Sequence, residues 1–299
     1  MPVLVTHTDF DGLACAVLVS SVEDVAEVRF TEPWLVQHRK VDVPKGAIIS
    51  DLPWHPNASL WFDHHASVHP PEKFEGKFDP AAKSAARVVL DYYENPWLSE
   101  KFSGLVDAAD QIDSARLSED EVLNPQGYYL LSVSLDAHDS AAASFNFRRR
   151  LIDLLRKKPL EQVLSDEAVR EACDKKLSLL RKVAPLLKEH TRVDGHVAIV
   201  DFRSAPSWLE NAGGRFIVYL QNRGCVASLR VRNSSQQGMV DLSVGNNVFS
   251  QGTPVDLGAL MKEFKGGGHH AAAGATVPEA EADAAIAGIC ARVNAAAKQ

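Results

Sequence analysis

The stretch VTHTDFDGLACAVLV, residues 5–19, places one histidine and two aspartates between an apolar run and a segment with a helical pattern. In an extended chain alternate side chains share a face, so His7, Asp9 and Asp11 point the same way. A tight turn at Gly12 would leave them clustered. Because clustered carboxylates repel one another, the stretch predicts a bound cation at a strand end. The alternative is a simple helix start that Asp11 caps.

Two further β-prone runs end in side chains that can bind a metal. AIIS is followed by Asp51, and LWF is followed by Asp63, His64 and His65. Helical patterns such as GLACAVLVSSV and AAKSAARVVLDYYEN lie between or after these runs, and such alternation indicates a parallel sheet. Ligands of open parallel sheets collect beyond the carboxyl ends of the strands, so the three ends are expected to meet in one crevice. Otherwise His64 and His65 are a packed surface pair.

Composition limits the classes of function. The chain has 299 residues, a net charge of −7 and four scattered cysteines without a C-x-x-C pair. The charge argues against binding nucleic acid through bulk electrostatics, and the cysteines indicate buried, reduced thiols rather than a zinc site or a disulfide framework. No apolar run approaches the length of a membrane span, and the N-terminus lacks a leader pattern. A cytoplasmic protein without membrane association is expected.

A fourth acidic segment lies in GLVDAADQIDSA, residues 104–115. Asp107, Asp110 and Asp113 recur every three residues, which is the spacing that aligns side chains on one face of a helix. These aspartates either contribute to the cation site or form a solvated acidic stripe. We expect at least some of the three to be solvated.

The second half of the chain changes character. Residues 148–192 show amphipathic helical patterns, and from His196 onward short β-prone runs alternate with turn residues, which indicates a mixed or antiparallel sheet. KGGGHHAAAG, residues 265–274, suggests a phosphate site, because consecutive glycines let backbone amides approach an anion and a following helix would add its positive end. A flexible loop is the alternative.

Taken together, DFDG, the lone Asp51, DHH at Asp63–His65 and GGGHHAAAG resemble the DHH phosphoesterase family with its DHH-associated C-terminal domain. The resemblance spans the chain and implies an α/β fold in three parts. These are a parallel-sheet catalytic domain (1–147), a helical linker (148–192) and a smaller mixed-sheet α/β domain that binds substrate across a cleft (193–299). It also implies two metal ions, usually Mn²⁺ and alternatively Mg²⁺.

The family's site residues carry over by position. The resemblance implies the metal ligands His7, Asp9, Asp11, Asp51, His64 and Asp110, with Asp51 bridging the two ions. Whether His7 coordinates is left open, and Asp107 is the alternative to Asp110. Asp51, His64, Asp63 and His65 form the catalytic group, in which Asp63 and His65 support the ligands. The implied substrate contacts are Arg230, Gly266, Gly267, Gly268 and His269.

The resemblance implies a hydrolase that cleaves phosphoester bonds of short single-stranded oligonucleotides or of small nucleotides such as 3′-phosphoadenosine 5′-phosphate. The spacing of the first motif, H-x-D-x-D-G, is closer to the D-x-D-x-D-G of RecJ-like exonucleases than to the H-x-x-x-D-x-D of small nucleotide phosphatases, and the T-D-T-G form of nanoRNases is missing. An exopolyphosphatase is the alternative among enzymes, and a metal-loaded nucleotide sensor is the alternative outside them. A homodimer is left open by the sequence.

Overall fold

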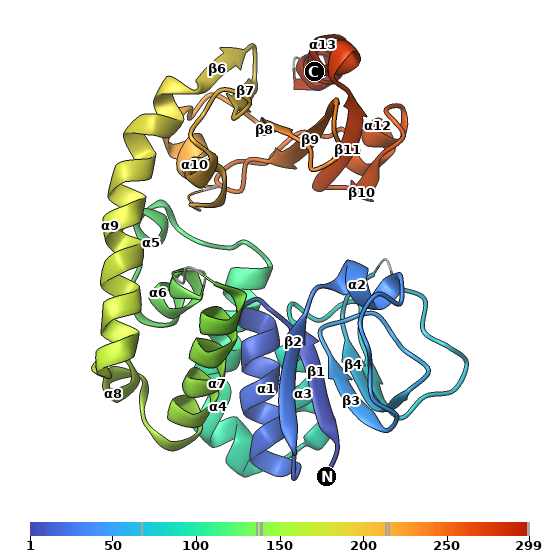
Figure 1. Cartoon of the computed structure of the whole chain (residues 1–299), viewed down its shortest axis with the longest axis vertical. Coiled ribbons are helices and arrows are strands. Elements are labelled where there is room, and N and C mark those ends of the chain that lie inside the picture. The colour runs from blue at the N-terminus through green and yellow to red at the C-terminus, as the bar shows by residue number, and fades with distance from the viewer. Residues whose placement is uncertain (67, 136, 138–139, 213, 215, 298–299) are drawn as a thin grey trace. The chain divides into compact units, whose positions relative to one another are not determined.

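The computed structural model describes residues 1–66, 68–135, 137, 140–212, 214 and 216–297. The chain divides into two compact units, one comprising Met1–Leu117 and Pro125–Lys176 and the other Ser118–Asn124 and Leu177–Gln299. Each unit is built on one β-sheet with helices packed on it (Figure 1). The α/β class expected from the sequence, with a parallel first sheet and a mixed second sheet, is confirmed.

The sheet of the first unit has five parallel strands in the order β2-β1-β3-β4-β5. The strands are β1 (Val3–His7), β2 (Glu27–Thr31), β3 (Ala47–Ser50), β4 (Ala58–Asp63) and β5 (Gly76–Phe78). Thr6 pairs with Ser50, and Ser50 pairs with Phe62. Since all the strands run in one direction, their carboxyl ends lie level along the same edge of the sheet.

The helices of the first unit include α1 (Phe10–Val22), α2 (Pro33–Gln37), α3 (Ala85–Tyr93), α4 (Pro96–Asp113), α6 (Gly127–Ser134), α7 (Ala141–Lys157) and α8 (Leu160–Leu164). Alternate strand residues serve two cores. Leu4, Ile48 and Phe62 pack with α1, α3, α4 and α7, whereas Val5, Ile49 and Trp61 pack with Val36 of α2 and with loop residues.

Helix α1 is buried from Phe10 to Ser20 because it lies among the sheet, α3, α4 and α7 (Figure 1). This position explains why its sequence is apolar nearly all round rather than amphipathic. The buried helix fixes the DFDG turn rigidly at the end of β1, which is where the candidate site begins.

The second unit has a six-stranded sheet in the order β10-β11-β9-β8-β7-β6. The strands are β6 (Thr191–Asp194), β7 (Val197–Asp201), β8 (Ala227–Asn233), β9 (Met239–Asn246), β10 (Gly267–His269) and β11 (Ala272–Pro278). The β7–β8 pair is parallel and the other pairs are antiparallel. Its helices are α5 (Glu119–Leu123), α10 (Ser207–Asn211), α11 (Ile217–Gln221), α12 (Leu257–Lys262) and α13 (Glu279–Ala297). Apolar residues of α12 and α13 pack on one face of this sheet.

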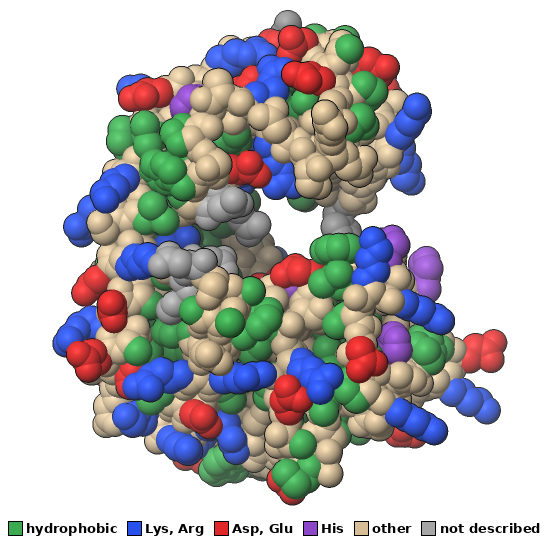
Figure 2. All heavy atoms as spheres, in the orientation of Figure 1, with side chains coloured by type: hydrophobic (Ala, Val, Ile, Leu, Met, Phe, Trp, Pro, Cys, Tyr) green, Lys and Arg blue, Asp and Glu red, His purple; other side chains and the backbone are tan. Residues whose placement is uncertain are grey.

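The segment expected as a linker is helical. Helix α7 packs against α1 in the first unit, and α9 (Glu167–Glu189) is continuous across the division between Lys176 and Leu177. All four cysteines are buried free thiols. No helix among the described residues combines the length and hydrophobicity that a membrane span requires. On the face drawn in Figure 2, basic and acidic side chains intermingle, which agrees with the charge of −7 in arguing against bulk electrostatic binding.

Candidate metal centre

Three neighbouring strands bring polar side chains to one place. His7 is the last residue of β1, Asp51 directly follows β3, and Asp63 ends β4 before His64 and His65. His7 Nδ1 lies 3.4 Å from Asp51 Oδ2, and His64 Nε2 lies 4.0 Å from Asp51 Oδ1. The strand ends therefore meet as the sequence predicted, and the parallel register is the reason.

The turn after β1 is held by its backbone. Asp9 is the N-cap of α1, where its carboxylate accepts a hydrogen bond from the Gly12 amide at 2.9 Å. A Cβ atom on Gly12 would lie 2.2 Å from the His7 carbonyl oxygen, so the helix can approach the strand only with glycine here. From α7, the buried Arg148 donates to the Thr8 carbonyl at 2.6 Å. These contacts place Asp9 Oδ2 3.0 Å from His7 Nδ1.

Asp51 lies at the centre of the cluster. Its backbone has φ +56°, a left-handed conformation that few residues other than glycine, asparagine and aspartate adopt readily. The side chain is 1% exposed and lies between His7 on one side and His64 and His65 on the other. A buried carboxylate that is held in this uncommon backbone conformation is typical of functional sites.

Asp11 and His64 are each oriented by the chain around the start of α3. The carboxylate of Asp11 accepts hydrogen bonds from the amides of Ala85 and Ala86 at 2.6 and 2.9 Å, at the positive end of that helix. His64 Nδ1 lies 3.2 Å from the Ala82 carbonyl oxygen, which can only accept. The Nδ1 nitrogen therefore carries the proton, and Nε2 faces Asp11 Oδ2 at 3.7 Å with a free lone pair.

The other two residues of the DHH triplet support this arrangement. Asp63 Oδ1 accepts hydrogen bonds from the His64 amide at 2.9 Å and from His65 Nδ1 at 2.7 Å. Asp63 is fully buried, so its carboxylate fixes both histidines in place. Outer carboxylates that orient imidazole ligands in this way are common around bound metals.

The structure does not bring Asp110 to the cluster. Its carboxylate accepts hydrogen bonds from Arg87 Nε and Nη2 at 3.0 and 2.7 Å and from Ser84 Oγ at 2.6 Å. The alternative, Asp107, also pairs with Arg87, at 2.7 Å, and is largely exposed. Asp113, the third aspartate of the stripe, instead lies 3.4 Å from His64 Nε2. The guanidinium of Arg87 is the physical reason, because it binds the two aspartates nearer to it.

Electrostatics at the site reflect crowded carboxylates. Burial and the charges of neighbouring aspartates raise the pKa of Asp11 and of Asp51 well above the ordinary value. Burial opposes protonation of His7, but its contacts with Asp51, Asp9 and Glu32 outweigh that effect and raise its pKa to about 12. Burial likewise opposes ionisation of Asp9, whereas His7 lowers the pKa of that carboxyl to about 2. Without a cation, a protonated imidazole offsets part of the negative charge.

The residues present fit divalent cations. His64 Nε2 and Asp51 Oδ2 are buried and have no hydrogen-bond partner among the described residues, so both have lone pairs to offer. Ligand atoms lie within 4.8 Å of one another in three groups, namely Asp51–His64–His65, His7–Asp9–Asp51 and Asp11–His64–Asp113. Carboxylates with one or two imidazoles are ligands that suit Mn²⁺ or Mg²⁺.

The candidate substrate residues of the second unit lie on its sheet. Arg230 on β8 donates to the Glu210 carbonyl at 3.0 Å, and its guanidinium lies 5.0 Å from the centre of the Phe202 ring. Gly267 and Gly268 belong to β10, which forms a hairpin with β11. The side chain of His269 lies outside the part of the chain that the structure describes.

The helix expected after the glycine run was wrong, because the chain turns into β11 there. A Cβ atom on Gly266 would lie 2.1 Å from the Gly274 carbonyl oxygen, and one on Gly268, at φ +146°, would lie 2.5 Å from the Ala273 Cα atom. These two glycines are therefore required by the hairpin itself. A Cβ atom on Gly267 would meet no other atom within 4 Å, so the hairpin does not require glycine at that position.

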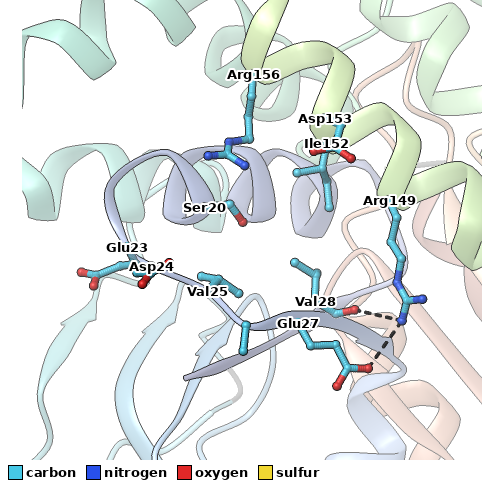
Figure 3. Close-up of a pocket in the computed structure, with 11 residues that line it drawn as sticks. Ser20, Glu23, Asp24, Val25, Glu27, Val28, Arg149, Ile152, Asp153 and Arg156 are labelled. Atoms are coloured by element: carbon cyan, nitrogen blue, oxygen red, sulfur yellow. Dashed lines mark hydrogen bonds and ion pairs between the residues drawn. The ribbon is translucent and has the colours of Figure 1, made fainter. Parts of the chain in front are cut away.

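A separate pocket of about 440 Å³ lies between the end of α1, the start of β2 and α7 (Figure 3). Its charged lining comprises Arg149 and Arg156 against Glu23, Asp24, Glu27 and Asp153. Arg149 already lies 3.6 Å from Glu27 Oε1. Carboxylates outnumber guanidinium groups, so the pocket lacks the positive charge that a phosphate ester needs, and it shares no residue with the cluster.

The chain is similar to one known domain family and to several solved structures. The model of the DHHA1 domain matches residues 228–295. PggH, a pGpG-specific phosphodiesterase from Vibrio cholerae, is 29% identical, with a TM-score of 0.79 over 99% of this chain and all of that one. An exopolyphosphatase-related protein from Bacteroides fragilis is 10% identical, with a TM-score of 0.62 over 99% of this chain and 93% of that one.

RecJ from Thermus thermophilus, in a structure with Mn²⁺, is 15% identical, with a TM-score of 0.57 over 97% of this chain and 51% of that one. No curated protein matches significantly. The fold is therefore the one that PggH and these two other proteins share. The DHHA1 match and the full-length likeness to PggH agree with the resemblance to the DHH phosphoesterase family that the sequence motifs indicate.

Proposed function

We propose that this protein is a phosphohydrolase that depends on two divalent metal ions. The observation that carries the proposal is the cluster at the strand ends, where the buried His64 Nε2 and Asp51 Oδ2 have no hydrogen-bond partner among the described residues. His64 Nε2 faces the carboxylates of Asp11 and Asp113, and Asp51 Oδ2 faces His7 Nδ1. A stable fold rarely leaves such atoms unpaired. The cost is explained if the lone pairs are kept for cations.

The geometry suggests how the ligands divide. His7 and Asp9 would hold one ion, and Asp11 and His64 the other, with Asp51 contributing to both. We assign the remaining position to Asp113 instead of Asp110, because only Asp113 reaches His64. Bound in this way, the ions would supply Lewis-acid activation of water and of the phosphoryl oxygens. Manganese is the proposed metal, and magnesium is compatible with the same ligands.

His65 is suited to hold a proton near the reacting phosphate. Its hydrogen bond to Asp63 raises the pKa of the imidazole, and that bond occupies Nδ1. The ring is about one-third exposed, so Nε2 is the nitrogen that can reach a substrate. We propose that His65 donates the proton on Nε2 to the oxygen that leaves phosphorus, while the buried Asp63 stabilises the protonated ring.

We propose a linear dinucleotide as the substrate within the wider class of short oligonucleotides and small nucleotides. The support is the full-length likeness to PggH, whose described specificity is for pGpG. The exopolyphosphatase-related neighbour shares the fold at 10% identity and adds no argument about substrate. The predicted substrate contacts remain Arg230, Gly266, Gly267, Gly268 and His269. A cytoplasmic location and a homodimer also remain predictions.

A panel of substrates tests the function. The purified protein is incubated with pGpG, 3′-phosphoadenosine 5′-phosphate, a cyclic dinucleotide and inorganic polyphosphate, each with Mn²⁺ and with EDTA. We expect hydrolysis of pGpG that exceeds the release of orthophosphate from polyphosphate and stops on chelation. Turnover of polyphosphate alone would contradict the substrate class, and equal turnover in EDTA would contradict the role of the metal.

A further inference from the structure

Glu32 connects the second strand to the candidate metal centre. It directly follows β2, whose last residue, Thr31, pairs with His7 at the end of β1. Its carboxylate makes no capping bond to α2 and turns to the neighbouring strand instead. Oε1 accepts a hydrogen bond from Thr8 Oγ1 at 2.5 Å, and Oε2 lies 3.4 Å from His7 Nε2.

The two nitrogens of His7 therefore face different partners. Nδ1 lies 3.0 Å from Asp9 Oδ2 and 3.4 Å from Asp51 Oδ2, whereas Nε2 faces Glu32. An imidazole binds a metal through the nitrogen that carries no proton, and an acceptor on the other nitrogen selects that tautomer. Glu32 is the acceptor on the Nε2 side. Its hydrogen bond would leave the Nδ1 lone pair directed at the cluster.

We propose that Glu32 is a positioning residue that makes His7 a metal ligand through Nδ1. This inference rests on the proposed metal-dependent function. Glu32 is not itself a ligand, because its two oxygens are directed to Thr8 and His7. Among the described residues, it belongs to none of the groups whose ligand atoms lie within 4.8 Å of one another.

The chain offers a matched control on the same strand. Glu27 begins β2, and its side chain is 42% exposed, against 46% for Glu32. Its Oε2 atom lies 2.9 Å from Arg29 Nη2, and Glu27 is not part of the cluster. Glu32→Ala removes the acceptor. Glu32→Gln keeps an oxygen for Nε2–H and an amide that can donate to the Thr8 hydroxyl, so it should rescue the orientation. Glu27→Ala changes charge and size equally without touching His7.

Calorimetric titration with Mn²⁺, in the absence of substrate, gives the first readout. We expect the wild type to bind two ions and Glu32→Ala to bind one of them about 10–100-fold more weakly, as when other outer partners of metal ligands are removed. Glu32→Gln should stay within about threefold of the wild type, since the orienting hydrogen bond is kept. Glu27→Ala should equal the wild type.

Electron spin-echo modulation of bound Mn²⁺ gives the second readout, because it detects imidazole nitrogen directly. Glu32→Ala should lose nitrogen modulation toward the level of His7→Asn, whereas Glu32→Gln should keep it. Thr8→Val removes the hydrogen bond to Glu32 Oε1 and should weaken Mn²⁺ binding less than Glu32→Ala does. If Glu32→Ala fails to fold, Thr8→Val is measured in its place. Wild-type affinity and nitrogen modulation in Glu32→Ala overturn the inference alone. A wild-type protein that binds no Mn²⁺ overturns the proposed function as well.

Discussion

Replacing Asp51 with asparagine tests the cluster while leaving its shape intact. Asparagine has the same volume and tolerates the left-handed backbone at φ +56° as well as aspartate does. The substitution therefore removes a charge and one anionic ligand from the middle of the site without straining the fold. We expect Asp51→Asn to fold without metal and to lose metal-dependent hydrolysis.

The expected magnitude follows from linkage. Free Mn²⁺ at about 1,000 times Kd stabilises the native state by about 4 kcal/mol per site, and a hundredfold weaker affinity leaves about 1.4 kcal/mol. Removing a residue that orients a metal ligand weakens metal affinity by up to about a hundredfold. Removing a ligand itself should therefore weaken the affinity by at least that factor. For a unit of the size of Met1–Leu117 with Pro125–Lys176, this difference reduces the Mn²⁺-induced rise in Tm by about 5–10 °C for each site that Asp51 serves.

The assay is thermal unfolding of wild type and variant in EDTA and in excess Mn²⁺, combined with turnover of pGpG. Asp24→Asn is the control, because this exposed aspartate lies in the separate pocket and should leave the metal-induced shift unchanged. An Asp51→Asn protein that keeps the full Tm shift and remains active would refute the reasoning.

Three further predictions concern the neighbours of Asp51. Asp113→Asn should lower Mn²⁺-dependent kcat about 100-fold or more, as expected for a metal ligand. Asp110→Asn should keep kcat within about tenfold of the wild type, because the Asp110 carboxylate binds the Arg87 guanidinium instead. The reverse order in steady-state kinetics would contradict the assignment of Asp113. Gly12→Ala should destabilise the fold by about 3 kcal/mol or more in urea, because its Cβ would meet a strand carbonyl at 2.2 Å, and an unchanged midpoint would contradict this. In EDTA the protonated Asp11 and Asp51 stabilise the fold fully below their unfolded-state pKa of about 4, and that contribution is lost as pH rises through their raised folded-state values. The urea midpoint should therefore be higher at pH 5 than at pH 8 in EDTA, and Mn²⁺ should reverse this order because it binds ionised ligands; an order that Mn²⁺ leaves unchanged would count against the site.

The convergence of the strand ends was predictable from sequence because it depends on local patterns. Short apolar runs that end in His7, Asp51 and Asp63, with helical segments between them, indicate parallel strands whose ends share an edge. The register in the structure agrees, since Thr6 pairs with Ser50 and Ser50 with Phe62. The same rule applies to Glu32 after VRFT, so the sequence did contain a signal for that residue.

The choice among the three aspartates of α4 was not predictable. Asp107, Asp110 and Asp113 have equivalent spacing, and the rotation of the helix decides which one faces His64. That rotation follows from packing against elements distant in sequence, because Leu98, Phe102, Leu105, Val106 and Ala109 of α4 are buried in the core. Arg87 of α3 then binds Asp107 and Asp110. The helix expected after the glycine run at 266–268 was wrong for a related reason, because close backbone packing in a hairpin also demands glycine, while the contact of these glycines with substrate stays a prediction.

Diffraction from a crystal grown in Mn²⁺, with data collected at the manganese absorption edge, tests the central claim most directly. We predict two anomalous peaks, one bounded by His7, Asp9 and Asp51 and the other by Asp11, Asp51, His64 and Asp113. Full occupancy of Mn²⁺ elsewhere on the molecule, with no anomalous density between these side chains, would contradict the account.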